Sequence, residues 1–300
     1  MSARIGLVGG AGFIGTGLAR AALAMGYRVS VLDPQPSLVP GVQYSNCELS
    51  DASALKEWMS DVDVVVLLAG LLSGPALRQP REAWATNVVG CTMALDAAIC
   101  AGVERVILLS SAAVYARDAE ARALSEVAPT APVGLYGTAK LSLEYAVRAA
   151  VAAGLPAALI LRPFTVFGHG PMRGERGHFI GRWLELALAG EALAIHGDGR
   201  QPVDLVQLET VSAICLRFVS EVAPPPLRIL NATGGAPLSV VELAAIFQQA
   251  HPGIRARHVP PAETAPLHGW GDPHAMSAYL GQMPPPPRAA IRAFLDEKFK

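Results

Sequence analysis

The amino-acid sequence predicts an α/β fold, a doubly wound parallel sheet with a smaller C-terminal substrate-binding region. Short apolar runs rich in β-branched residues alternate with alanine-rich segments of helical length, which is the pattern of parallel βαβ units. A glycine-rich turn joins the first apolar run to the first helical segment. After Pro163, stretches rich in glycine and proline interrupt the alternation. We therefore expect a first domain at residues 1–163, to which later strands return, and a mainly substrate-binding region at 164–300.

The expected strands are short and apolar, and helical segments separate them. We expect strands at residues 5–8, 28–32, 64–68, 105–109 and 158–161. We expect helices at residues 13–24, 52–59, 83–100 and 136–152. Right-handed crossovers place helices on both faces of such a sheet, and ligands bind at the carboxyl ends of its strands.

Composition and charge exclude several classes of protein. The 300 residues are enough for a sizeable core, and a formal net charge of −1 without basic runs argues against nucleic acid or an anionic membrane as a partner. No uninterrupted apolar run has the length of a membrane-spanning helix. The first expected strand begins too close to Met1 for a targeting peptide, so we expect a cytoplasmic protein.

The four cysteines point to reduced thiols. Cys47, Cys91, Cys100 and Cys215 lie far apart, with no CxxC pair among them. This spacing fits reduced, buried thiols better than disulfides or a zinc site. We therefore expect no metal.

The glycine-rich turn predicts a dinucleotide site. Gly9, Gly12 and Gly15 follow the spacing GxxGxxG between an expected strand and an expected helix. Glycine lets the backbone approach a pyrophosphate, whose charge the amides and the positive helix N-terminus stabilise. The alternative is a tight turn without a ligand, but the strand-turn-helix context favours the dinucleotide.

Asp33 indicates which dinucleotide is bound. It ends the second expected strand, where a carboxylate accepts hydrogen bonds from the adenosine ribose. The next three residues, at 34–36, include no basic side chain for a 2′-phosphate, which favours NAD over NADP. An ordinary Asp-Pro turn is the alternative.

Tyr136 and Lys140 are candidate catalytic residues. They lie four positions apart in an expected helix and so share one face. The Lys140 ammonium would favour the phenolate, allowing Tyr136 to exchange a proton with a substrate hydroxyl or carbonyl while hydride moves at nicotinamide. Ser111, just after the strand at 105–109, could hydrogen-bond the same oxygen.

With these motifs in this order, the chain resembles the extended short-chain dehydrogenase/reductase superfamily, specifically its NAD-dependent epimerase/dehydratase branch. The resemblance covers most of the chain and implies a Rossmann fold with NAD as cofactor. It implies that the following residues line the cofactor: Gly9, Gly12, Phe13, Ile14, Gly15, Asp33, Glu48, Leu49, Leu68, Ala69, Gly70, Asn87, Lys140, Pro163 and Phe164. It also assigns Lys140 to the nicotinamide ribose, and Pro163 and Phe164 to the nicotinamide. Asn87 could instead be a polar residue of a helix face, and Pro163 and Phe164 could be core residues.

Departures from the family pattern narrow the chemistry. Ala112 and Ala113 stand where sugar-nucleotide dehydratases carry an acidic pair, so dehydration is not expected. Val203 stands where sugar-nucleotide enzymes carry an arginine for the substrate diphosphate, which puts such a substrate in doubt. Other polar residues of this region that could contact a substrate are Arg173, Arg176, Arg200, His169, His178 and His196.

Three functions remain open. The first is an NAD-dependent oxidoreductase acting on a secondary alcohol or ketone of a sugar-like or small polar substrate. The alternative is an NAD-dependent sugar or nucleotide-sugar epimerase that works by transient oxidation. The third is a non-catalytic NAD-binding regulator, which the presence of Ser111, Tyr136 and Lys140 disfavours. The resemblance also implies a homodimer formed through the helices at 83–100 and 136–152.

Replacing Asp33 tests the ribose assignment. Asp33→Ala should weaken the preference for NAD over NADP, because the carboxylate that accepts from the ribose hydroxyls is lost. Dissociation constants for both cofactors measure this preference. An unchanged ratio would remove Asp33 from the cofactor site.

Overall fold

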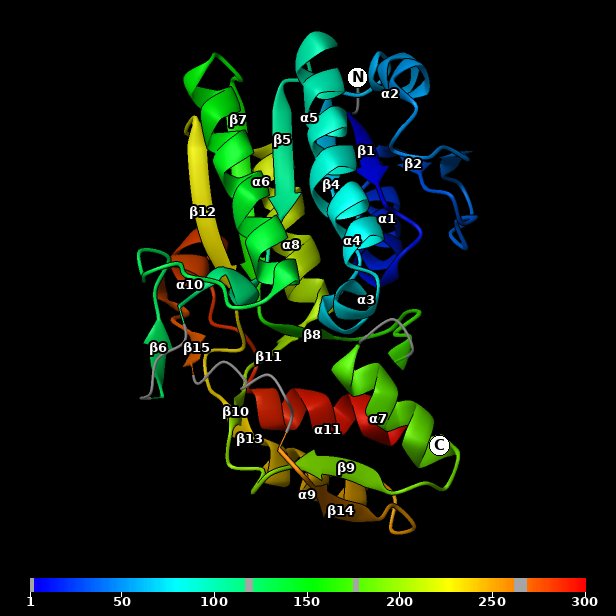
Figure 1. Cartoon of the computed structure of the whole chain (residues 1–300), viewed down its shortest axis with the longest axis vertical. Coiled ribbons are helices and arrows are strands. Elements are labelled where there is room, and N and C mark those ends of the chain that lie inside the picture. Colours follow the sequence, from blue (N-terminus) through cyan, green and yellow to red (C-terminus); the bar gives the residue numbers. More distant parts are fainter. Residues whose placement is uncertain (1–2, 117–120, 175–177, 262–268) are drawn as a thin grey trace.

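The computed structural model describes residues 3–116, 121–174, 178–261 and 269–300. Its main feature is a seven-stranded sheet of order β12-β7-β5-β4-β1-β2-β3, in which every neighbouring pair is parallel (Figure 1). These strands are β1 (Arg4–Val8), β2 (Arg28–Leu32), β3 (Gln43–Ser45), β4 (Val64–Leu67), β5 (Arg105–Leu109), β7 (Ala157–Pro163) and β12 (Leu227–Ala232). The order reverses between β1 and β4, where a doubly wound sheet opens its ligand crevice.

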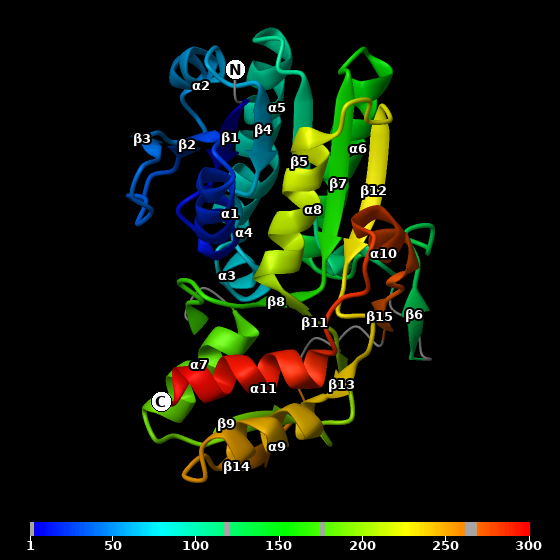
Figure 2. The same cartoon turned by 180° about the vertical axis from the view of Figure 1, so that it is seen from behind.

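Helices cover both faces of this sheet. The helices α5 (Cys91–Cys100) and α6 (Leu135–Ala152) cover the face in Figure 1, while α1 (Phe13–Ala24) and α8 (Leu208–Ser220) cover the face in Figure 2. Successive strand residues point to opposite faces, so Leu7 packs in the core under α1 and α8, whereas Val8 packs under α5 and α6. Burial on both faces explains why these strands are continuous apolar runs.

The expected fold class is confirmed, and most expected elements are present. The strand β2, the helix α1 and the helix α2 (Ala52–Met59) have the expected bounds. The strand β7 is longer than expected and continues to Pro163, while β4 ends one residue earlier, at Leu67.

The helix expected at residues 83–100 is part of a longer helical stretch. It consists of α4 (Pro80–Trp84), a π-helical segment η1 (Ala85–Gly90) and α5. A short helix α3 (Ser73–Arg78) precedes it. The π-segment, which has wider i→i+5 hydrogen bonding, contains the predicted site residue Asn87, and such segments are frequent at functional sites.

The helical stretch Pro80–Cys100 is long and apolar enough, by length and composition alone, to cross a membrane. Its mean hydropathy over the best window is 1.3, and 44% of that window is buried inside the structure. This stretch is not an uninterrupted apolar run, because it includes Arg81, Glu82 and Asp96. It lies against the sheet, and a core helix that packs by one face has the same composition.

The second half of the chain contributes to both regions of the molecule. The strand β12 returns to the edge of the main sheet and α8 packs on α1, with Leu208 directly against Gly17. The other elements below the sheet surround a separate apolar core (Figure 2). They are α7 (Phe179–Leu188), β9 (Leu193–His196), β10 (Pro202–Val203), β11 (Leu205–Gln207), β13 (Leu238–Ser239), α9 (Val240–Ala250), β14 (Ala256–Val259) and α11 (Pro287–Lys298).

Short elements link the two regions. The parallel pair of β8 (Thr165–Phe167) and β11 lies between the main sheet and the lower core. At one side, β6 (Arg122–Leu124) pairs with β15 (Gly269–Gly271), close to α10 (His274–Leu280). A 3₁₀ turn η2 (Ala112–Val114) follows β5.

The glycine-rich turn between β1 and α1 offers a test of packing. A Cβ at Gly15 would lie 2.5 Å from the carbonyl oxygen of Gly10, whereas a Cβ at Gly12 would meet only the Gly9 carbonyl oxygen, at 3.6 Å. We expect Gly15→Ala to lower the free energy of unfolding by about 1–3 kcal/mol, because the backbone of the turn must move. Gly12→Ala is the matched control and should cost less than about 1 kcal/mol, since Gly12 is only a helix N-cap. Chemical denaturation measures both, and equal losses would contradict this packing.

Candidate active site

The glycine-rich turn leaves an open backbone surface at the start of α1. Gly9 has a φ of +79°, and a Cβ there would lie 2.5 Å from the Cα of Ala69, so the turn lies directly against the end of β4. Gly12 has open space where a side chain would be, and α1 has neither a side-chain cap nor an acidic residue in its first turn. The free amides at this helix N-terminus suit an anion, so the residues present fit a dinucleotide pyrophosphate. Phe13 and Ile14 begin the helix and pack partly into the core.

Asp33 lies beside this turn, at the end of β2. Its carboxylate accepts hydrogen bonds from the backbone N–H groups of Ala11, at 3.0 Å, and Gln35, at 2.8 Å. Each carboxylate oxygen keeps lone pairs for further donors, such as ribose hydroxyls. The side chain is therefore fixed at the position where the sequence predicts the adenosine ribose.

Glu48 and Leu49 lie after β3 and differ in environment. The Glu48 side chain is exposed, and none of the described residues donates a hydrogen bond to it. Leu49 lies against the π-segment, because a Cβ at Gly90 would come 2.6 Å from the Cβ of Leu49. Leu49 thus lies against the segment that contains Asn87, while Glu48 faces solvent.

Leu68, Ala69 and Gly70 follow β4 and are partly exposed at the sheet edge. Asn87 is fully buried, accepts from the backbone N–H of Leu71 at 2.7 Å and donates to its carbonyl at 2.9 Å. A Cβ at Gly70 would lie 3.2 Å from Asn87 Oδ1 and 3.6 Å from Lys140 Nζ. Asn87 therefore holds the loop after β4 next to the predicted catalytic lysine, through one hydrogen bond at its amide oxygen and one at its amide nitrogen.

Ser111, Tyr136 and Lys140 come together where β5 ends and α6 begins. Gly137 lets the first turn of α6 lie against the carbonyl of Ala113, which brings Tyr136 close to the η2 turn. Lys140 is 3% exposed, donates from Nζ to the carbonyl of Leu109 at 2.8 Å, and lies 6.0 Å from the ring centroid of Tyr136. Ser111 Oγ accepts from the N–H of Ala113 at 3.1 Å, which leaves its proton free to bond a substrate.

Pro163 and Phe164 lie at the end of β7. Pro163 is buried, and the partly buried ring of Phe164 stacks on Tyr115, with centroids 6.4 Å apart and planes at 27°. Tyr115 is 1% exposed, and its hydroxyl donates to Asn231 Oδ1 at 2.6 Å. Tyr115 is therefore a buried aromatic residue with a satisfied hydroxyl.

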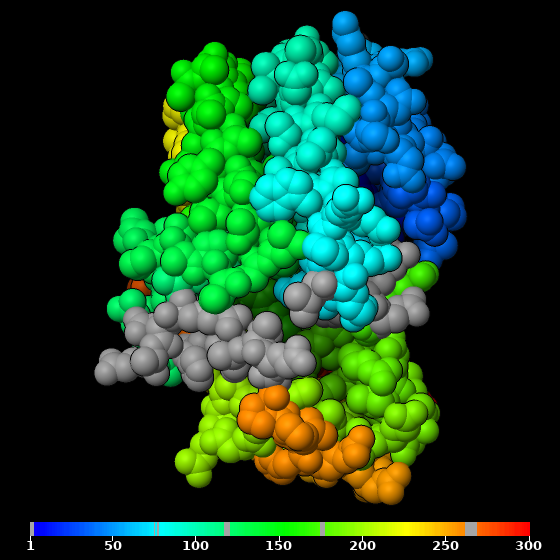
Figure 3. Space-filling view, in the orientation of Figure 1, coloured from blue at the N-terminus to red at the C-terminus, as the bar shows by residue number. Residues whose placement is uncertain are grey.

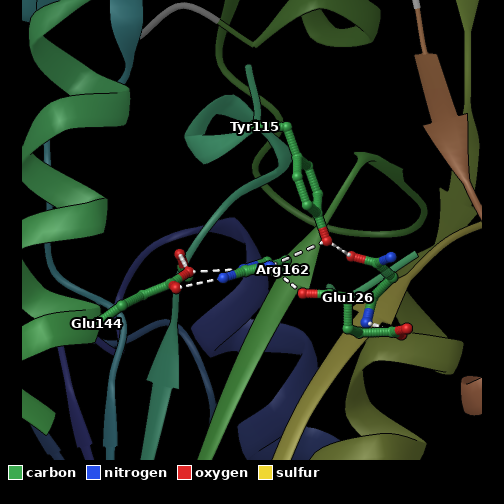
Figure 4. Close-up of polar contacts among 6 residues, drawn as sticks. Tyr115, Glu126, Glu144 and Arg162 are labelled. Carbon is green, nitrogen blue, oxygen red and sulfur yellow. Dashed lines mark hydrogen bonds and ion pairs between the residues drawn. The ribbon is translucent and has the colours of Figure 1, made fainter. Parts of the chain in front are cut away.

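A buried polar network lies directly behind these residues (Figure 4). Arg162 and Glu144 form a bidentate ion pair, with Nε to Oε1 at 2.8 Å and Nη2 to Oε2 at 2.6 Å. Nη1 of Arg162 donates to the Tyr115 hydroxyl at 3.1 Å and to the carbonyl of Glu126 at 3.0 Å. Burial opposes the charge of Arg162, but the hydrogen bonds and charge of Glu144 outweigh it and raise the pKa of Arg162. The sequence analysis missed this pair, although charged residues inside two otherwise apolar elements were the available signal.

The polar residues considered after Pro163 are dispersed. His169 pairs with Glu297 at 3.2 Å, and His196 Nδ1 lies 3.1 Å from the carbonyl of Pro260. Arg173 and Arg200 are exposed, the latter 3.9 Å from Asp198, and Val203 lies in β10 paired with Leu238. Arg176 lies outside the described residues.

His178 connects the lower region to the cofactor turn. Its Nδ1 accepts from the N–H of Gly181 at 3.1 Å and so caps α7, while its ring packs edge-on against Phe13, with centroids 5.0 Å apart. Burial lowers the pKa of His178 to about 4, so the imidazole is neutral near pH 7. The start of α7 therefore lies against the predicted cofactor site.

A cavity of about 530 Å³ opens between α7 and the β9–β14 pair. It does not include the predicted catalytic residues, which lie at the end of the main sheet. Its lining carries more cationic than anionic side chains: Phe179, Arg182, Trp183, Leu186, Gly190, Glu191, Ala192, Ala194, His196, Arg255 and Arg257. The three arginines are exposed.

The cysteines are free. Cys47, Cys91 and Cys215 are buried, whereas Cys100 is exposed, contrary to the expectation of buried thiols throughout. Burial raises the pKa of the Cys91 thiol and raises that of Cys215 to about 12. Across the described ranges, no group of three or more His, Cys, Asp or Glu residues is placed to hold a metal ion.

The chain is similar to known proteins along most of its length. The NAD dependent epimerase/dehydratase family matches residues 5–232. A UDP-glucose 4-epimerase of Corynebacterium glutamicum is 30% identical over 297 residues, covering 91% of this chain and 86% of the relative. A dTDP-6-deoxy-L-talose 4-dehydrogenase (NAD(P)(+)) of Kitasatospora kifunensis is 29% identical, covering 89% and 86%.

Solved structures have the same fold over the whole length. The structure described as MoeE5 in complex with UDP-glucuronic acid and NAD matches with a TM-score of 0.86 and 27% identity, covering 97% of this chain and 96% of that chain. The family's cofactor is NAD, as the glycine turn and Asp33 predict, and its members are enzymes. This chain therefore belongs to the NAD dependent epimerase/dehydratase family.

Proposed function

We propose that this protein is an NAD-dependent epimerase that inverts a carbinol carbon of a nucleotide sugar by transient oxidation. The observation that carries the proposal is the convergence of Ser111, Tyr136 and Lys140 beside the open glycine turn. Such a site can move a proton at a substrate hydroxyl next to a dinucleotide. The relatives that are named as UDP-glucose 4-epimerases favour this function over a net oxidoreductase.

Each of the three side chains has a distinct role in the proposal. Tyr136 takes the proton of the substrate hydroxyl during oxidation and returns it during reduction. The ammonium of Lys140, held by the carbonyl of Leu109, stabilises negative charge on the phenol oxygen. Ser111 donates a hydrogen bond to the substrate oxygen and holds it near Tyr136. NAD, when bound, would supply the redox chemistry, since its oxidised form would accept a hydride and its reduced form would return it in the same turnover.

Epimerisation is favoured over dehydration by the residues next to Ser111. Ala112 is buried and Ala113 exposed, and neither can supply or accept a proton. Water elimination needs an additional acid or base beside the sugar, and the methyl groups of the two alanines cannot transfer a proton.

The cavity beside α7 is the proposed site of the nucleotide diphosphate. Arg182, Arg255 and Arg257 supply positive charge there, which answers the doubt raised by Val203. Among the described residues, Arg257 has no hydrogen-bond or ion-pair partner. Because His178 joins the start of α7 to Phe13, the helix that lines this cavity also packs against the predicted cofactor turn.

Tyr136→Phe tests the catalytic assignment. We expect turnover to fall by about 10²-fold or more, while NAD affinity changes little, because only the proton-carrying hydroxyl is lost. Purified protein with NAD is assayed on UDP-glucose and dTDP-sugars, following product stereochemistry by NMR and NADH by its absorbance. Tyr145→Phe, on the exposed side of the same helix, is the control and should keep full activity.

Two results would count against the proposal. Full activity of the Tyr136→Phe protein would exclude the phenol from the mechanism. Accumulation of NADH in proportion to product would identify a net dehydrogenase instead, because an epimerase regenerates NAD in each cycle.

We also propose that the protein is a homodimer formed through α5 and α6. These helices lie side by side on one face of the molecule, cyan and green in Figure 3. Apolar side chains on this face are half or more exposed, among them Val89 at 50% and Tyr145 at 61%. Two such helices from each subunit would pack as four and cover this face.

Charges introduced on this face test the dimer. The Val89→Asp/Tyr145→Asp double variant should change the mass in solution from twice 31.3 kDa to 31.3 kDa, because two buried carboxylates oppose the interface. Light scattering after gel filtration measures the mass. Val222→Asp, 97% exposed and far from these helices, is the control. A monomeric wild-type protein would refute the proposal.

A further inference from the structure

The Glu144–Arg162 pair is among the most deeply buried charged groups of the described residues. Arg162 is 2% exposed and Glu144 is fully buried. The pair is geometrically complete, since both carboxylate oxygens and all three guanidinium nitrogens are bonded. Buried ion pairs contribute little net stability, because desolvation offsets their attraction. A role in fixing geometry therefore explains this pair better than a role in stability.

Glu144 fastens the catalytic helix to the strand that carries Ser111. Glu144 lies one helical turn after Lys140, so both side chains leave α6 on the same side. Lys140 donates to the carbonyl of Leu109, and Glu144 accepts from the hydroxyl of Ser110 at 2.5 Å. These two bonds join α6 to consecutive residues of the chain, immediately before Ser111. The distance between Ser111 and the Tyr136–Lys140 helix is thus set by two polar bonds, one at Lys140 and one at Glu144.

Arg162 fastens the other side of the site. It immediately precedes Pro163 and Phe164, the residues predicted to lie near nicotinamide. Its guanidinium also holds the hydroxyl of Tyr115, whose ring stacks on Phe164. One ion pair therefore connects the strand that carries Pro163 with the helix that carries the proton-transfer groups.

We propose that the Glu144–Arg162 pair is a positioning element that holds the proton-transfer groups and the nicotinamide-side residues in one geometry. This inference rests on the proposed function, because it assigns the pair to the site where the proton moves. The pair itself lies behind the site and is not assigned a contact with substrate or cofactor.

The network has no corresponding contact on the adenine side. Within the described part of the chain, no hydrogen bond or ion pair joins Glu144, Arg162 or Tyr115 to the glycine turn, Asp33 or Glu48. Loss of the pair should therefore affect the nicotinamide end and leave the adenine end unchanged. A general loss of structure would affect both ends.

The test compares two ligands that share the adenine end. ADP-ribose lacks the nicotinamide ring, whereas NADH carries it. For Glu144→Gln, which leaves the guanidinium without its counter-charge, we expect the dissociation constant of ADP-ribose to stay within about twofold. We expect that of NADH to rise about tenfold or more, with a changed fluorescence of the bound nicotinamide. Calorimetry measures the dissociation constant of ADP-ribose, and fluorescence titration measures that of NADH.

A second variant keeps the experiment decisive if Glu144→Gln does not fold. In the Glu144→Met/Arg162→Met double variant, apolar side chains replace both charges, an exchange that proteins often tolerate without loss of stability. It should melt close to the wild-type temperature and show the same split between the two ligands. Asp63→Asn is the matched control, because its ion pair with Arg4 lies at the opposite, amino-terminal edge of the sheet. This control should leave the dissociation constants of both ADP-ribose and NADH unchanged.

The outcomes separate this inference from the proposed function. Equal weakening of ADP-ribose and NADH, or no change in either, would overturn the positioning role. In a protein that turns over nucleotide sugars, kcat should also fall at least tenfold in both pair variants. If the wild-type protein turns over no nucleotide sugar, the proposed function fails, while the comparison of the two ligands still decides the role of the pair.

Discussion

The parallel direction of all seven strands of the main sheet is the constraint on which the rest of the structure depends. Because every strand ends at the same edge, the turns after β1, β4, β5 and β7 meet there, although they are far apart in the sequence. Gly9 against Ala69, and Gly70 beside Asn87 and Lys140, are direct results. No single element contains the site.

The end of the sheet is rich in buried polar groups, several of which form hydrogen-bonded networks. Besides Glu144 and Arg162, the buried carboxylate of Asp204 accepts from the Thr233 hydroxyl and from the N–H groups of Gly234 and Gly271. Burial raises the pKa of Asp204, although these hydrogen bonds oppose the shift. The Glu144–Arg162 network and the Asp204 network meet at the end of β12. Asn231 accepts from Tyr115 in the first network, and Thr233 donates to Asp204 in the second. Directional bonds therefore orient the lower region relative to the sheet edge, in addition to apolar contact, which has no preferred direction.

Family membership and chemistry are separate questions for this chain. Proteins similar to this chain are named as epimerases, dehydrogenases and dehydratases alike, so the fold does not select a reaction. The selection comes from a few side chains at the carboxyl edge and in the lower region. In our proposal, Ala112 and Ala113 disfavour dehydration, and the arginines of the cavity beside α7, rather than a residue at Val203, supply positive charge for the substrate. These local changes leave the fold intact, since none of them replaces a side chain of the sheet core.

The sequence by itself determined the fold class, the glycine-rich turn between β1 and α1, and most elements of the first half, because these depend on local spacing. Apolar runs, GxxGxxG and the four-residue separation of Tyr136 and Lys140 are all short-range patterns. The sequence-based prediction of the elements failed at local details, such as the π-helical segment around Asn87. The Glu144–Arg162 pair joins residues 18 positions apart in different elements, and the Asp204 contacts span up to 67. Only the tertiary structure could decide these contacts, because a hydrogen bond between distant segments depends on how the chain folds back on itself.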